Sequence, residues 1–264
     1  NPNDPTERLP FLVSAQVEFV TNGNVQHVEL VAYGQNAIFY TPDTYVDGLP
    51  PYTIIDEVNA EFHWDTTLPI VIYGYAVIDE GDHLIVDAGT QIYLHANAGI
   101  WVFKDGQITV NGTKENPVVF QGDRLDEFYR DLPGSWDRIW INENNSGMDN
   151  VFNYAIIKNS FIGIQAETLP FDRIEGIADN NLILNNTVIE NTQAIGLFSQ
   201  NYRILGSNLL ISNSGQYNVA LLGGGVYQFV HSTIANYWDG SREDPALLAA
   251  NYFSDAATGD VLIY

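Results

Sequence analysis

The densest cluster of charged side chains in the sequence lies between residues 123 and 131. Carboxylates at this density supply the hard oxygen ligands that Ca²⁺ prefers. The candidate calcium ligands are Asp123, Asp126, Glu127 and Asp131. Their spacing is not that of an EF-hand loop, and Arg124, Arg130 and Arg138 are interleaved with them or follow them closely. Three interpretations of this segment therefore remain, namely a salt-bridged structural corner, a calcium site and a catalytic loop. Ca²⁺ is the only cofactor that the sequence suggests.

Glycoside hydrolysis is the enzymatic alternative, and it needs two carboxylates about 5–9.5 Å apart. Glu190 is the only acid between residues 181 and 236, so the best pair is Asp172 with Glu175, in a preceding loop. A polysaccharide lyase needs a basic residue to remove a proton, and the chain has only ten Lys and Arg. Its strongly acidic surface would also repel a polyanionic substrate. We therefore favour a protein without catalytic activity.

Tryptophan side chains offer a second kind of chemistry, the stacking of a flat ring on a sugar. The candidate platform is Trp136, Trp140 and Trp238. Large aromatic side chains also dominate protein cores. Burial over the corners of the fold is therefore the competing interpretation of these three residues.

A repeated phrase indicates the framework that carries these residues. The four copies are 155–159, 187–191, 209–213 and 232–236, each with an Ile two places before a closing Asn. The last two steps are about 22 and 23 residues, and the first is about ten longer. Such a recurrence is typical of repeat architectures. In a parallel β-solenoid the closing residues Asn159, Asn191, Asn213 and Asn236 would form a structural ladder at one corner, because Asn tolerates a left-handed backbone and its amide can bond to the next copy.

For the rest of the chain, the sequence pattern predicts short strands separated by turns that contain Gly and Asn. Alternating apolar residues flank the Asn-Gly turn at 21–24, which predicts a β-hairpin. We expect a flexible tether at 1–10, a small antiparallel β unit at 11–68 that covers the first edge, and a solenoid at 69–264 that lacks its C-terminal cap. Insertions at coil corners are expected at 122–137 and 167–173.

Charge excludes one class of partner. The chain carries 33 Asp and Glu against ten Lys and Arg, a net charge of −23, whereas nucleic-acid binding needs a basic footprint. There is no cysteine, so no disulfide framework and no thiolate metal site are expected. No apolar run reaches the length of a membrane-spanning helix.

Five stretches carry a resemblance to known proteins. The stretches 77–93 and 111–120, the latter with the pattern Gly-Thr-x-x-x-Pro-Val-x-Phe, resemble the pectate-lyase-like superfamily. The stretches 120–124, 133–136 and 234–238 resemble bacterial β-helix surface lipoproteins. The resemblance implies an all-β fold, namely a right-handed parallel β-helix solenoid with a small N-terminal antiparallel β unit.

The same resemblance implies a place and a role. It implies a lipid anchor ahead of Asn1 at the outer membrane of a Gram-negative bacterium, with the membrane reached only through that anchor. We expect a non-catalytic cell-surface scaffold or binding protein whose partner is an outer-membrane protein or a surface glycan. The alternatives are a carbohydrate-active enzyme of the same superfamily, and a subunit of an outer-membrane assembly that docks through an apolar end at 247–264.

Overall fold

The computed structural model describes residues 11–55, 61–168, 177–254 and 261–263. Every regular element in these residues is a β-strand, and most of the strand pairs are parallel. The expectation of an all-β fold is therefore confirmed. No helix that could span a membrane occurs among the described residues.

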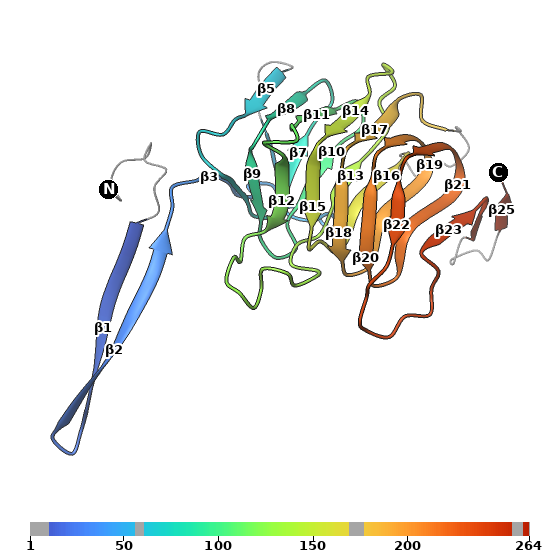
Figure 1. The fold of residues 1–264 in the computed structure, drawn as a ribbon. Coiled ribbons are helices and arrows are strands. Elements are labelled where there is room, and N and C mark those ends of the chain that lie inside the picture. The colour runs from blue at the N-terminus through green and yellow to red at the C-terminus, as the bar shows by residue number, and fades with distance from the viewer. Residues whose placement is uncertain (1–10, 56–60, 169–176, 255–260, 264) are drawn as a thin grey trace.

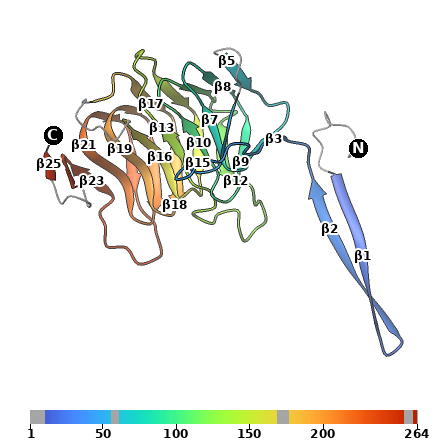
Figure 2. The ribbon, with the colours of Figure 1, turned by 180° about the vertical axis from the view of Figure 1, so that it is seen from behind.

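The predicted hairpin is present and is longer than the sequence pattern suggested. Strands β1 (Phe11–Thr21) and β2 (Asn24–Gly34) pair antiparallel along their whole length. Asn22 and Gly23 form the turn with φ of 52° and 79°, as a two-residue hairpin of this type requires. The hairpin projects away from the rest of the molecule as an arm (Figure 1 and Figure 2). We had expected this segment to cover the first edge of the parallel sheets. The hairpin does not do so.

The parallel strands form three ladders, which the chain visits in a fixed order. The first ladder is β3 (Ile38–Tyr40), β6 (Ile70–Ile72), β9 (Gln91–Leu94), β12 (Val118–Gly122), β15 (Ala155–Lys158), β18 (Val188–Thr192), β20 (Leu210–Ser214) and β22 (Thr233–Ala235). The second is β4 (Tyr52–Ile54), β7 (Tyr75–Ile78), β10 (Gly99–Val102), β13 (Ile139–Ile141), β16 (Ile162–Glu167), the first parts of β19 and β21, and β23 (Leu247–Ala250). The third is β5 (Glu61–Trp64), β8 (His83–Asp87), β11 (Gln107–Asn111), β14 (Asn150–Asn153), β17 (Asn181–Asn185) and the last parts of β19 (Ile195–Ser207) and β21 (Tyr217–Val230).

The ladders begin earlier in the chain than the expected boundary at residue 69. Strands β3, β4 and β5 already pair in parallel with β6, β7 and β8. Each of these first strands has only three or four residues, too few for periodicity to distinguish a parallel strand from an antiparallel one. The antiparallel unit is therefore the arm alone.

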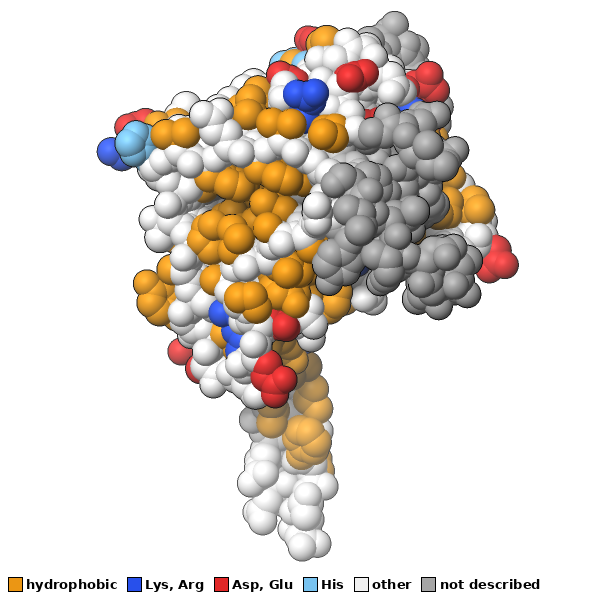
Figure 3. Space-filling view, turned by 90° about the vertical axis from the view of Figure 1, so that its right-hand side faces the viewer, with side chains coloured by type: hydrophobic (Ala, Val, Ile, Leu, Met, Phe, Trp, Pro, Cys, Tyr) orange, Lys and Arg blue, Asp and Glu red, His pale blue; other side chains and the backbone are white. Residues whose placement is uncertain are grey.

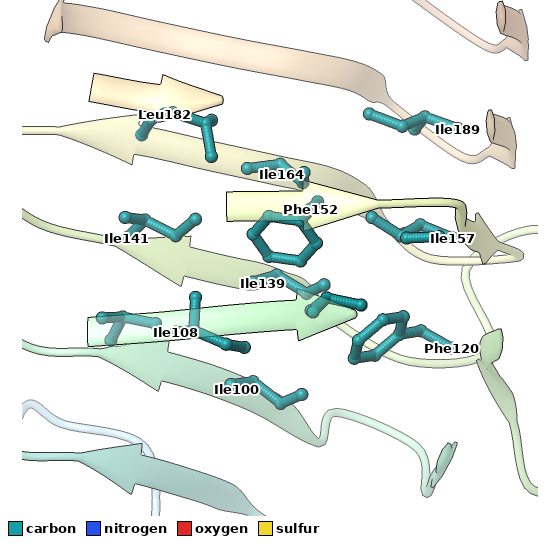
Figure 4. Close-up of a cluster of buried hydrophobic side chains, with 14 of the residues drawn as sticks. Ile100, Ile108, Phe120, Ile139, Ile141, Phe152, Ile157, Ile164, Leu182 and Ile189 are labelled. Carbon is teal, nitrogen blue, oxygen red and sulfur yellow. The ribbon is translucent and has the colours of Figure 1, made fainter. Parts of the chain in front are cut away.

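The core consists of columns of aliphatic and aromatic side chains that run between the ladders. Ile157, Ile189 and Ile211, each at most 1% exposed, stack in register as the repeat predicted. Phe120 extends this column by one strand, and Phe152 packs beside it with the two ring centroids 6.3 Å apart (Figure 4). Alternate residues point inward on each strand, so successive copies of the phrase superpose on one another.

The Asn ladder forms over three of its four expected members. Asn159, Asn191 and Asn213 have φ between 56° and 67°. Asn191 Nδ2 donates to Asn159 Oδ1 at 2.7 Å, and Asn213 Nδ2 donates to Asn191 Oδ1 at 3.1 Å. Asn236 instead pairs with the backbone of Ser214, donating to its carbonyl oxygen at 3.1 Å. The chain leaves the sheet after Asn236, so no tight corner is needed there.

A second column of left-handed corners lies at the other end of the same strands, and sequence reasoning missed it. Its members precede the first column by five residues, and they are Tyr154, Asn186, Asn208 and His231, with φ of 47°, 51°, 55° and 52°. Asn208 Nδ2 donates to Asn186 Oδ1 at 2.8 Å. The strands of the first ladder are thus bracketed by two corner columns.

The corner between the second and third ladders is polar and buried. Tyr202 is 0% exposed, and burial raises the pKa of its hydroxyl well above the ordinary value. The hydroxyl accepts from Asn180 Nδ2 at 2.8 Å and donates to the Asn142 carbonyl at 3.0 Å. Buried polar groups of this kind are stabilising only while each keeps its partner.

Substitution Tyr202→Phe should therefore lower the free energy of unfolding by about 1–3 kcal/mol, because it leaves buried polar groups without a partner. The matched control is Tyr45→Phe, since Tyr45 is 73% exposed and bonds only within its own loop. Urea denaturation followed by tryptophan fluorescence measures both. Equal stability of the two variants would contradict a structural role for the Tyr202 network.

At the C-terminal end, an antiparallel pair follows the ladders. It consists of β24 (Tyr252–Ser254) and β25 (Val261–Ile263). Figure 3 shows hydrophobic side chains gathered on this end of the molecule, where Val226, Val230 and Leu247 are each about 40% exposed. Tyr227, Phe229 and Ile234 pack against the last part of the core beneath them.

Candidate functional site

A pocket lies on the outer face of the first ladder, at the corner formed by the Asn ladder. It has a volume of about 610 Å³. Its lining residues are Asp131, Pro133, Lys158, Asn159, Glu190, Asn191, Asn213, Tyr237, Trp238 and Asp239. We call it the Trp238 pocket. One wall is the loop between β12 and β13, the other is the segment that follows β22, and β15 and β18 form the floor.

The Asn ladder holds the first wall in place. Asn159 Nδ2 donates to the Arg130 carbonyl and Asn191 Nδ2 to the Asp131 carbonyl, both at 2.6 Å. The loop returns to the corner at Ser135, whose backbone N–H donates to the Asn159 carbonyl at 2.8 Å. The same amides that stack the coils thus fix the loop that carries Asp131.

The floor places opposite charges on neighbouring strands. Lys158 and Glu190 are paired in register on β15 and β18, so their backbones are about 4.8 Å apart. Lys158 Nζ lies 4.0 Å from Asp131 Oδ1. With Asp239 on the far wall, three carboxylates and one ammonium group line the pocket.

Aromatic side chains form the second wall. The Trp238 backbone N–H donates to Asn236 Oδ1 at 3.3 Å. Its indole ring packs on Gly215, where an added Cβ would lie 3.2 Å from Cζ2. Tyr237 is 78% exposed. The indole position is therefore fixed by packing, whereas the tyrosine ring is free to contact a ligand.

The arrangement combines apolar ring faces with a polar floor. Carboxylates and side-chain amides accept and donate hydrogen bonds, and aromatic rings offer flat apolar surface. A polyhydroxylated ligand with an apolar ring face matches both features, and an extended polyanion does not match three carboxylates. The pocket is thus suited to a neutral saccharide ring.

The three tryptophans of the expected platform lie in separate places. Trp136 is 1% exposed, and its Nε1 donates to the Lys158 carbonyl at 2.8 Å. Trp140 belongs to the second ladder, where it stacks on Trp101 at 4.5 Å between centroids and an angle of 9°. Only Trp238 lines the pocket. The sequence prediction grouped these residues because all three are tryptophans. In the structure, one is buried, one lies on the second ladder and one lines the pocket.

The expected calcium ligands also lie apart. Asp123 Oδ2 lies 2.6 Å from His95 Nδ1, Asp126 pairs with Arg124 at 3.4 Å, and Asp131 pairs with Arg130 at 3.3 Å. Glu127 is exposed. Among the residues that the structure describes, no three or more His, Cys, Asp or Glu are grouped to hold a metal ion. These distances match the salt-bridged corner that the interleaved arginines suggested.

The expected catalytic pair, Asp172 and Glu175, lies outside the described residues. Glu190, which is isolated in the sequence, gains Asp131 and Asp239 as neighbours in the pocket. Asp131 is about 60 residues away along the chain. One feature of the sequence could have placed Lys158 and Glu190 side by side. Each of them directly precedes an Asn of the ladder.

Comparison with models of known protein families, with curated proteins and with solved structures gave no match for this chain. The role of the Trp238 pocket is therefore argued from its geometry and chemistry.

Proposed function

We propose that this chain is a non-catalytic binding protein with a right-handed parallel β-helix fold, and that it binds a carbohydrate in the Trp238 pocket. The fixed order of the three ladders supports the β-helix, as do left-handed Asn corners 22 residues apart. The cell-surface location, the N-terminal lipid anchor and a role beside an outer-membrane partner rest on the sequence resemblance alone.

One observation carries the proposal. The Trp238 pocket places a packed indole ring and an exposed tyrosine ring opposite a floor of amide, carboxylate and ammonium groups. Recognition of a sugar needs both parts, since the rings contact C–H groups while the polar floor bonds to hydroxyls. Because hydrogen bonds from the Asn ladder hold one wall and a hydrogen bond to Asn236 holds the other, the ligand meets a preorganised site.

Hydrolysis is the second candidate, because three carboxylates gather in the same pocket. A glycosidase needs one carboxyl group shielded from water so that it stays protonated as the general acid. The Asp131 side chain is 66% exposed and already pairs with Arg130, Asp239 is exposed, and Glu190 is partly exposed rather than buried. Binding without cleavage is therefore the better match to this pocket.

Binding is tested on a glycan array followed by calorimetric titration of the best oligosaccharide. Substitution Tyr237→Ala should weaken binding about tenfold, the equivalent of about 1.4 kcal/mol, through loss of the exposed ring. The matched control is Tyr45→Ala, a tyrosine of similar exposure on a distant loop. Unchanged affinity in Tyr237→Ala, or the absence of any glycan ligand, would contradict the proposal.

Cleavage is tested separately by release of reducing sugar from the same oligosaccharide. We expect no release above background from the wild-type chain. Release that disappears in Glu190→Gln while binding persists would establish the hydrolase instead.

A further inference from the structure

A second pocket lies on the same outer face of the first ladder, at the other corner column. It has a volume of about 550 Å³. Its lining residues are Lys114, Tyr154, Asn186, Val188, Asn208, Leu209, Leu210, His231 and Thr233. We call it the His231 pocket. Strand β18 contributes to both pockets, Val188 to this one and Glu190 to the Trp238 pocket.

The sign of the charge in this pocket is opposite to that of the whole chain. Its lining includes one lysine and one histidine and no Asp or Glu, although acids outnumber Lys and Arg by 33 to ten in the sequence. The Trp238 pocket, by contrast, has three carboxylates and one lysine. On this face, the His231 pocket is therefore the favourable place for a negative charge.

Within the part of the chain that the structure describes, Lys114 makes no hydrogen bond or ion pair, so its ammonium group is available as a cationic ligand. Every other Lys and Arg among the described residues makes a hydrogen bond or an ion pair with another residue. Gly112, two residues before Lys114, lies directly against the backbone of Tyr154, where an added Cβ would clash. This contact places the turn that carries Lys114 beside the pocket.

Further donors face the same space. Asn208 Nδ2 donates to Asn186 Oδ1 at 2.8 Å, and Asn186 Nδ2 has no hydrogen-bond partner within the described residues. His231 occupies the next corner of this column, with φ of 52°. An amide N–H₂, an imidazole ring and an ammonium group together can donate to the oxygens of a carboxylate or a sulfate.

The floor of the pocket is apolar. Val188 and Leu210 are paired in register on β18 and β20, and both are partly exposed on the outer face. Such a floor suits the C–H face of a sugar ring that bears the anionic group. The corner residues Asn186 and Asn191 bracket most of β18 and are five positions apart, which is at most about 17 Å at 3.3 Å per residue. An oligosaccharide of a few rings can therefore reach both pockets.

We propose that the His231 pocket binds an oxyanion substituent, a carboxylate or a sulfate, on the carbohydrate whose neutral part occupies the Trp238 pocket. This inference rests on the proposed function and gives its ligand class, an oligosaccharide with a negative charge a few rings away from a neutral ring. Lys114 and His231 set the preference for the charge, and the Trp238 pocket supplies affinity that does not depend on it.

The experiment uses three matched probes, namely a uronate-containing oligosaccharide, its carboxyl-reduced neutral counterpart and a sulfated form of that counterpart. We expect the wild-type chain to bind at least one charged probe about tenfold more tightly than the neutral one. Lys114→Gln should remove that preference and leave the affinity for the neutral probe unchanged. Tyr237→Ala should weaken the binding of all three probes. The charge control is Arg124→Gln, since Arg124 is exposed and lines neither pocket.

The outcomes separate the two proposals. Binding of the neutral probe with no preference for either charged probe overturns the anion site and leaves the proposed function standing. A preference that persists in both Lys114→Gln and His231→Gln also overturns it. Binding of none of the probes overturns both. Which charged probe is preferred decides between carboxylate and sulfate.

Discussion

Substitution of Phe152 by Ala should lower the free energy of unfolding by about 3–5 kcal/mol, the cost of deleting a buried phenyl group and leaving a cavity. Phe152 is 0% exposed and packs against Phe120 and the Ile157 column (Figure 4). Phe152 is held in register between Val110 on one neighbouring strand and Leu184 on the other, so the core has little freedom to close the gap.

The matched control is Phe161→Ala, which removes the same group from a side chain that is 40% exposed. Its expected effect is smaller, about 1–2 kcal/mol, because a large part of the side chain stays in water on folding and its removal leaves no enclosed cavity. Denaturant unfolding of both variants measures the difference. Similar losses in the two variants would show that the Phe152 column is not the core of the fold.

Substitution of Asn191 by Leu should cost about 2–5 kcal/mol of stability and also weaken ligand binding. A left-handed backbone costs a leucine about 1–2 kcal/mol, and loss of the amide leaves partners without a hydrogen bond at about 1–3 kcal/mol. Those partners include Asn159 Oδ1 and the Asp131 carbonyl. Since the second bond holds one wall of the Trp238 pocket, stability and affinity should fall together.

A glycine variant separates the two causes. Glycine at position 191 adopts the φ of 57° without strain but lacks the amide. Compared with Asn191→Leu, Asn191→Gly should therefore regain part of the lost stability and none of the lost affinity. Asn208→Gly provides the same change in the other corner column, remote from the loop that carries Asp131, and since Asn208 lines the His231 pocket the two variants are compared with a neutral oligosaccharide. Full affinity in Asn191→Gly would contradict the role of the ladder in shaping the pocket.

Features that depend on local order were predictable from the sequence. The Asn-Gly turn gave the hairpin, since its backbone requirement is met within two residues. The repeated Ile gave the core column, and Asn at the end of each phrase gave the left-handed corners. Asn186 and Asn208 are also Asn residues 22 positions apart. Comparison of the positions five residues before each closing Asn would have indicated the second column.

Features that depend on how segments far apart in the sequence come together in space were not predictable. The Trp238 pocket joins a loop at Asp131, a strand residue at Glu190 and a turn at Trp238, and their meeting depends on how insertions fold back over the corner. A tryptophan in the sequence does not reveal whether it faces the core, as Trp136 does, or stacks along a ladder, as Trp140 does. The acids from 123 to 131 are close in the sequence, but Asp123, Asp126 and Asp131 contact three different side chains, His95, Arg124 and Arg130.

The framework and the candidate site are connected through one set of side chains. The Asn amides that align successive coils also bond to Arg130 and Asp131 in the inserted loop. A repeat that looked purely structural in the sequence thus positions one wall of the pocket. We infer that binding affinity in this protein is sensitive to the corner columns as well as to the residues that contact the ligand.

The most direct test of the proposed function is a crystal structure of the chain with the best-binding oligosaccharide from the array. We expect an intact oligosaccharide on the outer face of the first ladder, with one ring against Trp238 and Tyr237. Cleaved sugar in that pocket, or an oligosaccharide bound elsewhere on the molecule, would contradict it.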